Sequence, residues 1–106
     1  MSKTIKDYTR PRKNGPGSVE LKIEEWSLGL VAYSFNDCDS EFVDLLAEAL
    51  EEFGTLTHTT GVSGATMNRF IQSEVRSVLE ERFGDRLIVE GDNDVRYNSY
   101  KYTLKH

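Results

Sequence analysis

The chain has 106 residues, of which 38% are hydrophobic and 29% are charged, and its formal net charge is −5 at pH 7. This length suits a single domain, and this composition excludes an intrinsically disordered chain. The longest apolar run is too short for a membrane-spanning helix, and the first residues lack the apolar stretch of a secretory signal. The single cysteine, Cys38, forms no internal disulfide, so we expect a cytoplasmic protein that does not contact a membrane.

Basic and acidic side chains are distributed unevenly along the chain. Residues 1–17 hold five basic side chains against one acidic side chain, whereas residues 18–93 hold five against sixteen. Residues 94–106 are basic again, with three basic side chains against one acidic one. Proline and glycine interrupt residues 11–17, and residues 1–17 lack apolar periodicity. We therefore predict a flexible basic N-terminal arm at residues 1–17 and a single α+β domain at residues 18–106.

The first half of this domain contains two strand patterns and one helix pattern. Alternating apolar and polar residues predict a strand over 19–25, and the more continuously apolar residues 28–35 predict another. The sequence leaves open whether they form a hairpin or one long bulged strand. A helix follows to about residue 53, because Gly54 is a C-terminal stop and apolar side chains recur at helical spacing: Phe42, Leu45, Leu46, Ala49, Leu50 and Phe53.

The second half repeats the alternation of strand and helix. Residues 55–60 are rich in β-branched threonine and predict a short strand near a sheet edge. Residues 86–90 and 95–104 predict a hairpin around a Gly-Asp-Asn-Asp turn. Between them, a helix over 64–83 is predicted by a second apolar stripe at helical spacing: Met67, Phe70, Ile71, Val75, Val78, Leu79 and Phe83.

These elements predict an α+β fold in the order β(β)-α-β-α-β-β. Two amphipathic helices pack on one face of a mostly antiparallel sheet of four to five strands. If the other sheet face carries Lys22, Glu24 and Thr57, we expect that face to be exposed to solvent and the chain to be a monomer. The face needs a cover, and a homodimer follows, if it carries Val31, Tyr33 and Phe35.

The first predicted helix is unusually acidic. Seven carboxylates fall within residues 37–52, with no basic side chain among them. Like charges one turn apart repel each other, and glutamates at the end of a helix oppose its dipole. A helix that keeps this arrangement suits a basic partner, although a merely solvated face has the same pattern. We predict a partner-binding acidic face made of Glu41, Asp44, Glu48, Glu51 and Glu52.

The basic side chains support an alternative function, which is nucleic-acid binding. The arm supplies cations for phosphate groups, and strand 95–104 mixes cations with tyrosines that suit single-stranded nucleic acid. Helix 64–83 is the other candidate contact. The predicted contact residues are Lys3, Lys6, Arg10, Arg12, Lys13, Arg69, Arg76, Lys101 and Lys105.

Residues 61–71 favour the same alternative through a short resemblance. The stretch Gly-Val-Ser-Gly-Ala-Thr-Met-Asn-Arg-Phe-Ile resembles the turn and recognition helix of helix-turn-helix regulators. The resemblance implies that helix 64–83 reads DNA, with residues 86–104 as a wing. It covers eleven residues only, and residues 53–60, which would have to supply the preceding helix, contain Gly54 and several threonines, which are poor helix formers.

The loop before helix 64–83 is a third candidate site. A strand, a glycine loop and a helix N-terminus together can hold an anion through free backbone N–H groups. No lysine stands where a phosphate-binding loop places one, so the pattern also fits an ordinary capped turn. The residues of this anion site are Thr60, Gly61, Ser63, Gly64 and Thr66.

Catalytic patterns are sparse. His58 lies among threonines and is interpreted as polar surface, and the carboxylates beside Cys38 disfavour its thiolate. No metal-ligand spacing is found, and no cofactor is expected.

We therefore predict a small acidic binding protein that is not an enzyme and whose partner is another protein. It would be an accessory, adaptor or inhibitor of the kind that phages and plasmids carry. The alternatives are a nucleic-acid-binding module and a small anion-binding or enzymatic domain built on loop 59–66.

Overall fold

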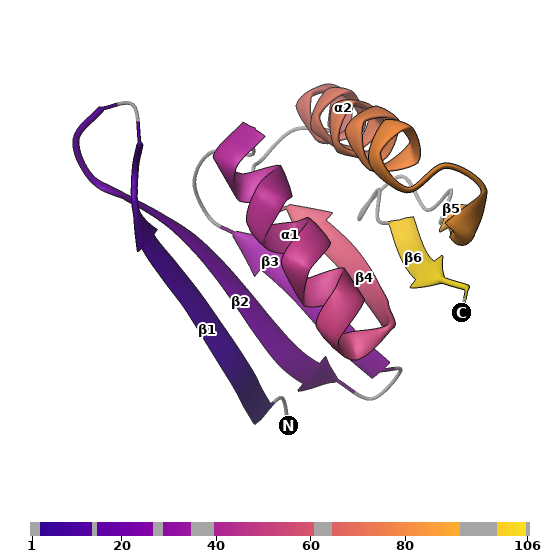
Figure 1. The fold of residues 1–106 in the computed structure, drawn as a ribbon, viewed down its shortest axis with the longest axis horizontal. Helices are drawn as coiled ribbons and strands as arrows, with labels where there is room; N and C mark the ends of the chain where they lie inside the picture. The colour runs from indigo at the N-terminus through magenta and orange to yellow at the C-terminus, as the bar shows by residue number, and fades with distance from the viewer. Residues whose placement is uncertain are drawn as a thin grey trace.

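A computed structural model describes residues 3–13, 15–26, 29–34, 40–60, 65–91 and 100–105. Within these residues the chain forms six strands, two α-helices and one short 3-10 turn (Figure 1). In chain order the elements are β1 (Lys3–Pro11), β2 (Ser18–Trp26), β3 (Gly29–Ser34), α1 (Ser40–Phe53), β4 (Thr55–Thr60), α2 (Ala65–Phe83), η1 (Gly84–Arg86), β5 (Leu87–Gly91) and β6 (Tyr100–Leu104).

The strands form one sheet in the order β1-β2-β3-β4-β6-β5. Neighbouring strands are antiparallel, with the exception of β3 and β4, which are parallel. This pair is parallel because α1 connects its two strands and carries the chain back along the sheet. Figure 1 shows α1 lying along the strands in front of the middle of the sheet, with α2 beside it.

The expected fold class is confirmed in its coarse form, which is α+β with two helices and a mostly antiparallel sheet. The expected count of four to five strands is too low for the described residues, which contain six. The strand patterns at 19–25 and 28–35 correspond to two strands, β2 and β3, which pair antiparallel from Trp26 opposite Gly29. Of the two alternatives left open by the sequence, these strands form the hairpin.

The additional strand is β1, in the part of the chain that was expected to be a flexible arm. The expectation of an irregular segment is wrong for residues 3–11, which pair with β2 along its length. The apolar-alternation rule missed β1 because its alternate side chains are basic or aromatic instead of aliphatic. One irregularity, between Thr4 and Lys6, interrupts the pairing.

One face of the sheet and both helices enclose the hydrophobic core. In β2 the side chains of Val19, Leu21 and Ile23 are buried, as their alternation predicts. Helix α1 buries its whole predicted stripe apart from Phe53, which is partly buried. Among the described side chains of α2, the predicted Val75, Leu79 and Phe83 are buried and Ile71 packs against the core. The prediction is wrong for Val78, which is 41% exposed, and it missed the buried Gln72. Met67 and Phe70 lie outside the described side chains.

The other sheet face combines the two sets of residues that the sequence offered as alternatives. The register places Lys22 opposite Tyr33, and it places Val31 between Glu24 and Thr57. Residues that face each other across neighbouring strands share one side of a sheet. This face is therefore mixed, with apolar and charged side chains in adjacent positions, and Phe35 lies outside the described residues.

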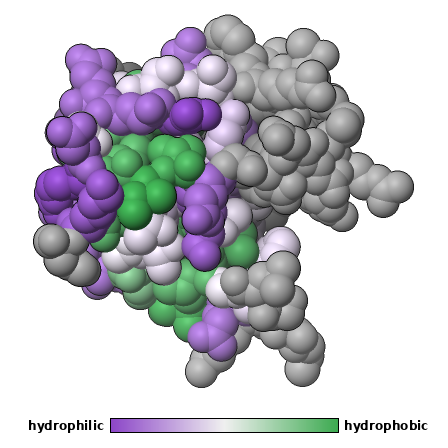
Figure 2. Space-filling model, turned by 90° about the vertical axis from the view of Figure 1, so that its right-hand side faces the viewer, coloured by the Kyte–Doolittle hydropathy of each residue, from purple (hydrophilic) through white to green (hydrophobic). Residues whose placement is uncertain are grey.

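The two edges of the sheet differ in character. Edge strand β1 carries Lys6, Arg10 and a proline, which are features that discourage edge-to-edge pairing. Edge strand β5 is short and largely apolar, and its Ile88 is 39% exposed. Figure 2 looks onto the side of the molecule where β5 lies and shows hydrophobic surface bordered by hydrophilic side chains. The β1 edge is therefore basic, whereas β5 carries no basic side chain.

Candidate functional site

The acidic side chains of α1 lie along one side of the helix because they recur every three or four residues. Glu41, Asp44, Glu48 and Glu52 follow this spacing, and Glu51 lies beside Glu52. The intervening apolar residues pack into the core and fix how the helix is rotated on the sheet. The acidic side is therefore held at the boundary between the core and solvent.

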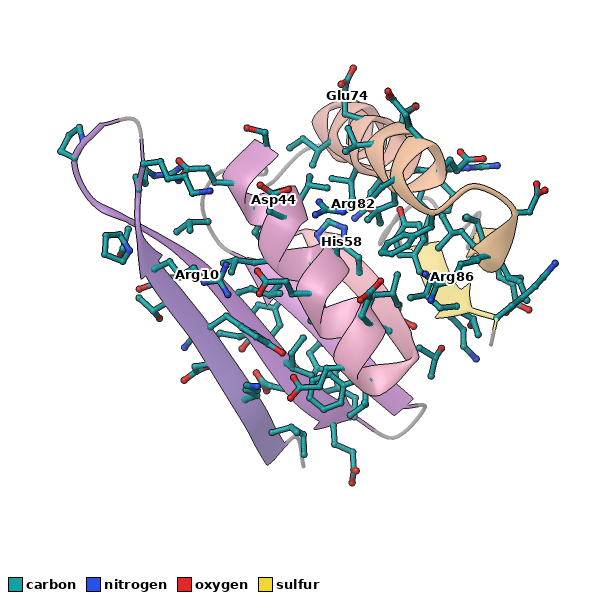
Figure 3. The ribbon with its side chains drawn as sticks, in the orientation of Figure 1. Arg10, Asp44, His58, Glu74, Arg82 and Arg86 are labelled. Carbon is teal, nitrogen blue, oxygen red and sulfur yellow. The ribbon has the colours of Figure 1, made fainter. Side chains whose placement is uncertain are left out.

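Strand β1 brings basic side chains to the same place. Its register with β2 sets Lys6 opposite Ile23, Tyr8 opposite Leu21 and Arg10 opposite Val19. The β2 residues of these pairs point into the core beneath α1, so their β1 partners point to the helix side of the sheet. Figure 3 shows Arg10 extending from β1 toward α1.

These side chains form a continuous charged layer between β1 and α1, which consists of Lys6, Tyr8, Arg10, Arg12, Glu41, Glu48 and Glu52. Lys6 Nζ lies 2.9 Å from Glu52 Oε1, and the Tyr8 hydroxyl donates to the same carboxylate. Arg10 donates from both terminal nitrogens to the two oxygens of Glu48, one of them at 2.6 Å. Such paired bonds fix the guanidinium and carboxylate planes relative to each other.

The charged layer shifts the ionisation of its members. The hydrogen bond from Arg10 lowers the pKa of the Glu48 carboxyl, and hydrogen bonds from Tyr8 and Lys6 lower the pKa of Glu52. The same bonds raise the pKa values of Lys6 and Arg10. All members of these pairs therefore keep their charges at neutral pH.

The turn after β1 anchors the other end of the layer. Arg12 Nη1 lies 3.5 Å from Glu41 Oε2. Both side chains are largely shielded from solvent, with 14% and 17% of their surface exposed. The backbone N–H of Lys13 donates to Glu41 at 2.8 Å. A shallow pocket of about 40 Å³ adjoins this end and is lined by Arg10, Pro11, Lys13, Val19, Glu41, Asp44 and Leu45. It is much smaller than ordinary ligand pockets, which measure several hundred Å³.

Two further cations complete the pairing of the acidic face. Asp44 Oδ1 lies 2.7 Å from Nη1 of Arg82 in α2, and Figure 3 shows Arg82 between the two helices. Glu51 Oε1 lies 3.6 Å from Nη1 of Arg86 in η1. Each of the five residues predicted as the acidic face therefore has a basic partner within this chain. Residue patterns along the sequence do not predict this pairing, because the cations lie 29 or more residues from their carboxylates.

The residues predicted for nucleic-acid contact are divided between several places. Lys6, Arg10 and Arg12 belong to the charged layer, whereas Arg76 pairs with Glu80 at 3.0 Å and lies over the Tyr100 ring. Lys101 and Lys105 are exposed at β6, which three strands separate from β1. The side chains of Lys3 and Arg69 lie outside those that the structure describes.

The predicted anion site lies largely outside the described part of the chain. Gly61, Ser63 and Gly64 lie outside the described residues, as do the side chains of Thr60 and Thr66. The turn residues of the helix-turn-helix resemblance share this stretch.

β4 and α2 contribute a buried polar pair that the sequence did not predict. His58 of β4 and Gln72 of α2 are both fully buried, so the interpretation of His58 as polar surface is wrong. His58 Nδ1 lies 3.2 Å from Gln72 Oε1, and Gln72 Nε2 donates to the backbone oxygen of His58 at 3.3 Å. Because the amide oxygen accepts, the imidazole proton belongs on Nδ1. Burial lowers the pKa of His58 to about 4, so the ring is neutral at pH 7.

Two buried polar side-chain atoms, one of them in this pair, have no hydrogen-bond partner within the described structure. They are His58 Nε2 and the Tyr102 hydroxyl. The pair also packs against an aromatic ring, with the Phe42 and His58 ring centroids 5.4 Å apart. The signal for it in the sequence is that Gln72 stands three and seven residues before Val75 and Leu79, on the buried side of α2.

Other kinds of site are not found in the described part of the chain. No group of three or more histidine, cysteine or acidic side chains there could hold a metal ion. Neither described helix has the length and apolar character needed to cross a membrane.

No protein family matches the chain, and no curated protein and no solved structure is significantly similar to it. The charged layer is the candidate functional site because it brings predicted acidic and basic site residues together.

Proposed function

We propose that the chain is a non-enzymatic binding protein that contacts a basic partner protein through the acidic face of α1. The observation that carries the proposal is the charged layer itself. Within this layer Glu41, Glu48 and Glu52 of α1 already hold basic side chains of β1 and that of Arg12 after it. The contact of Glu48 with Arg10 is bidentate. A surface that orders cations of its own chain has the spacing to order those of another protein.

The exposure of the charged layer supports access by a partner. The side chains of Lys6 and Glu52 are 42% and 46% exposed, and those of Arg10 and Glu48 are 51% and 46% exposed. Exposed ion pairs contribute little to stability, because water and salt screen them, so breaking them for another cation costs little free energy. The acidic face therefore stays available to an incoming cation although it is paired within the chain.

Charge reversal alone is a poor test, because it also breaks pairs within the chain. A better test compares two variants. One is Glu48→Lys with Glu52→Lys, and the other adds Lys6→Glu and Arg10→Glu, which restores opposite charges across the layer while inverting the sign of the α1 face. We expect the unmodified chain to capture a basic protein from nuclease-treated extracts of its source cells, and both variants to lose it.

The four-substitution variant is the decisive control. It should unfold at close to the temperature of the unmodified chain, because its ion pairs are kept with their signs exchanged. Capture of the same partner by this variant would contradict the proposed function. Capture that nuclease treatment abolishes would favour the nucleic-acid alternative instead.

A further inference from the structure

Strand β1 is attached to the molecule differently from the other strands. None of its described side chains belongs to the buried core, and only Tyr8 packs against that core. The neighbouring strand, β2, buries three aliphatic side chains. Backbone pairing with β2 and the charged layer therefore hold β1, whereas apolar burial contributes little.

The ion pairs that hold β1 weaken as the salt concentration rises. The pairs of Lys6 with Glu52 and of Arg10 with Glu48 are about half exposed, so dissolved salt screens them. Segments with few buried apolar contacts open locally at a lower free energy than the core does. β1 is accordingly the described strand with the weakest attachment to the core.

We propose that β1 is exchangeable, and that a basic extended segment of a partner protein takes its place at the edge of the sheet, paired with β2 and with its cations facing α1. This inference rests on the proposed function and names the chemistry of the partner. Addition of a strand to an open sheet edge supplies backbone hydrogen bonds, while the acidic row of α1 supplies selectivity for charge.

The register of β1 defines what the incoming segment must carry. Only alternate residues of a strand on the β2 edge face α1, and these are now Lys6, Tyr8 and Arg10. Lys6 and Tyr8 meet Glu52, and Arg10 meets Glu48. The fitting segment therefore runs antiparallel to β2 and has two cations separated by four positions, with an aromatic hydroxyl side chain midway.

The two ends of β1 are not equally secured. At the turn, Arg12 and Lys13 contact the shielded carboxylate of Glu41, and the Arg12 N–H donates to the Gly17 carbonyl at 3.1 Å. At the other end the cation of Lys6 is 42% exposed. Opening therefore begins at the Lys6 end and proceeds toward the turn.

Hydrogen exchange of the full chain tests the opening. We expect the hydrogen-bonded amides of β1 to exchange about tenfold faster in ~1 M NaCl than in ~0.05 M NaCl, because salt screens the ion pairs. Amides of β2 and α1 serve as internal controls and should change little. Amides of β1 as protected as those of β2 at both salt concentrations would overturn the proposal.

Peptide binding to the full chain tests the exchange. The probe is a labelled peptide with the sequence of Lys3–Pro11, and the control peptide carries Lys6→Glu and Arg10→Glu. A chain with Lys6→Ala and Arg10→Ala should bind the probe about tenfold more tightly than the unmodified chain, because its own strand competes less well. The control peptide should not bind, and equal binding of both peptides would overturn the proposal.

Two further results separate this inference from the proposed function. If charge inversion abolishes partner capture while β1 amides remain insensitive to salt, the proposed function stands and strand exchange is rejected. If the unmodified chain forms a dimer in size-exclusion chromatography with light scattering, and the probe peptide dissociates it, the occupant is a second copy and the assignment to a partner protein is rejected.

Discussion

The buried pair of His58 and Gln72 makes the stability of this core depend on pH. His58 is fully buried and donates through Nδ1 to Gln72, but its Nε2 has no partner among the described residues. A charged imidazole at this place would need a second acceptor and would lose its hydration. The fold therefore selects the neutral form of His58.

The pH dependence of stability follows from this preference. The pKa of His58 is about 4 in the folded chain, whereas an unfolded histidine has a pKa of about 6.5. The unfolded chain therefore takes up a proton first, so stability is complete above about pH 6.5 and falls as the pH approaches 4. The loss reaches about 3 kcal/mol near pH 4. Urea unfolding at stepped pH values measures it.

The variant His58→Gln provides the control for this prediction. It cannot be protonated, so its free energy of unfolding should be flat between about pH 6.5 and pH 5. Glu48 and Glu52 have lowered pKa values, and their contribution is lost only at lower pH, as they take up protons. Equal slopes for the variant and the unmodified chain in the higher range would exclude His58 as the cause.

At the scale of elements, the sequence predicted the helices and strands whose apolar side chains recur at a regular spacing. Strand β2 and helix α1 follow from alternation and from a helical stripe, and both exist. Strand β1 could not be found this way, because its partners on α1 are 38 to 46 residues away and carry the opposite charge. For α2 the apolar stripe identified Val75, Leu79 and Phe83 as core residues but wrongly included Val78 and missed Gln72, because a polar residue occupies a core position.

The candidate site was predicted in its parts and missed as a whole. The acidic face and the basic segment were both identified by residue, but as separate surfaces for separate partners. Charge patterns give the sign of a surface and not its neighbours, since the neighbours depend on which strands pair. The pairing of β1 with β2 is the step that places Arg10 beside Glu48.

The end of α1 depends on one residue that the sequence identified. Gly54 has a φ of 83°, its N–H donates to the Leu50 carbonyl, and its carbonyl accepts from Leu104 of β6. A side chain would meet no neighbour there, but this backbone conformation is unfavourable for residues with a Cβ. We expect Gly54→Ala to lower the free energy of unfolding by about 1 kcal/mol.

Chemical denaturation checks this prediction against a matched substitution. Ser77→Ala lies on the exposed side of α2 and should be neutral or slightly stabilising, because alanine has the higher helix propensity. If Gly54→Ala is also neutral, the strain at the end of α1 is smaller than its φ value implies.

At the scale of the whole molecule, stability and the candidate site occupy different layers. The buried core lies between the middle of the sheet and the two helices, and it includes no described side chain of β1. The charged layer lies at one edge of the sheet, outside this core. The net charge of −5 therefore hides local compensation, because acidic α1 and basic β1 face each other.

This separation predicts that core and layer respond differently to substitution. Leu46→Ala removes a fully buried side chain of α1 and should lower the free energy of unfolding by about 2–5 kcal/mol. Lys6→Ala with Arg10→Ala should have a much smaller effect on thermal unfolding while increasing the exchange of β1 amides, because only exposed pairs are lost. If the double substitution destabilises the chain as much as Leu46→Ala does, β1 belongs to the cooperative core and the layers are not independent.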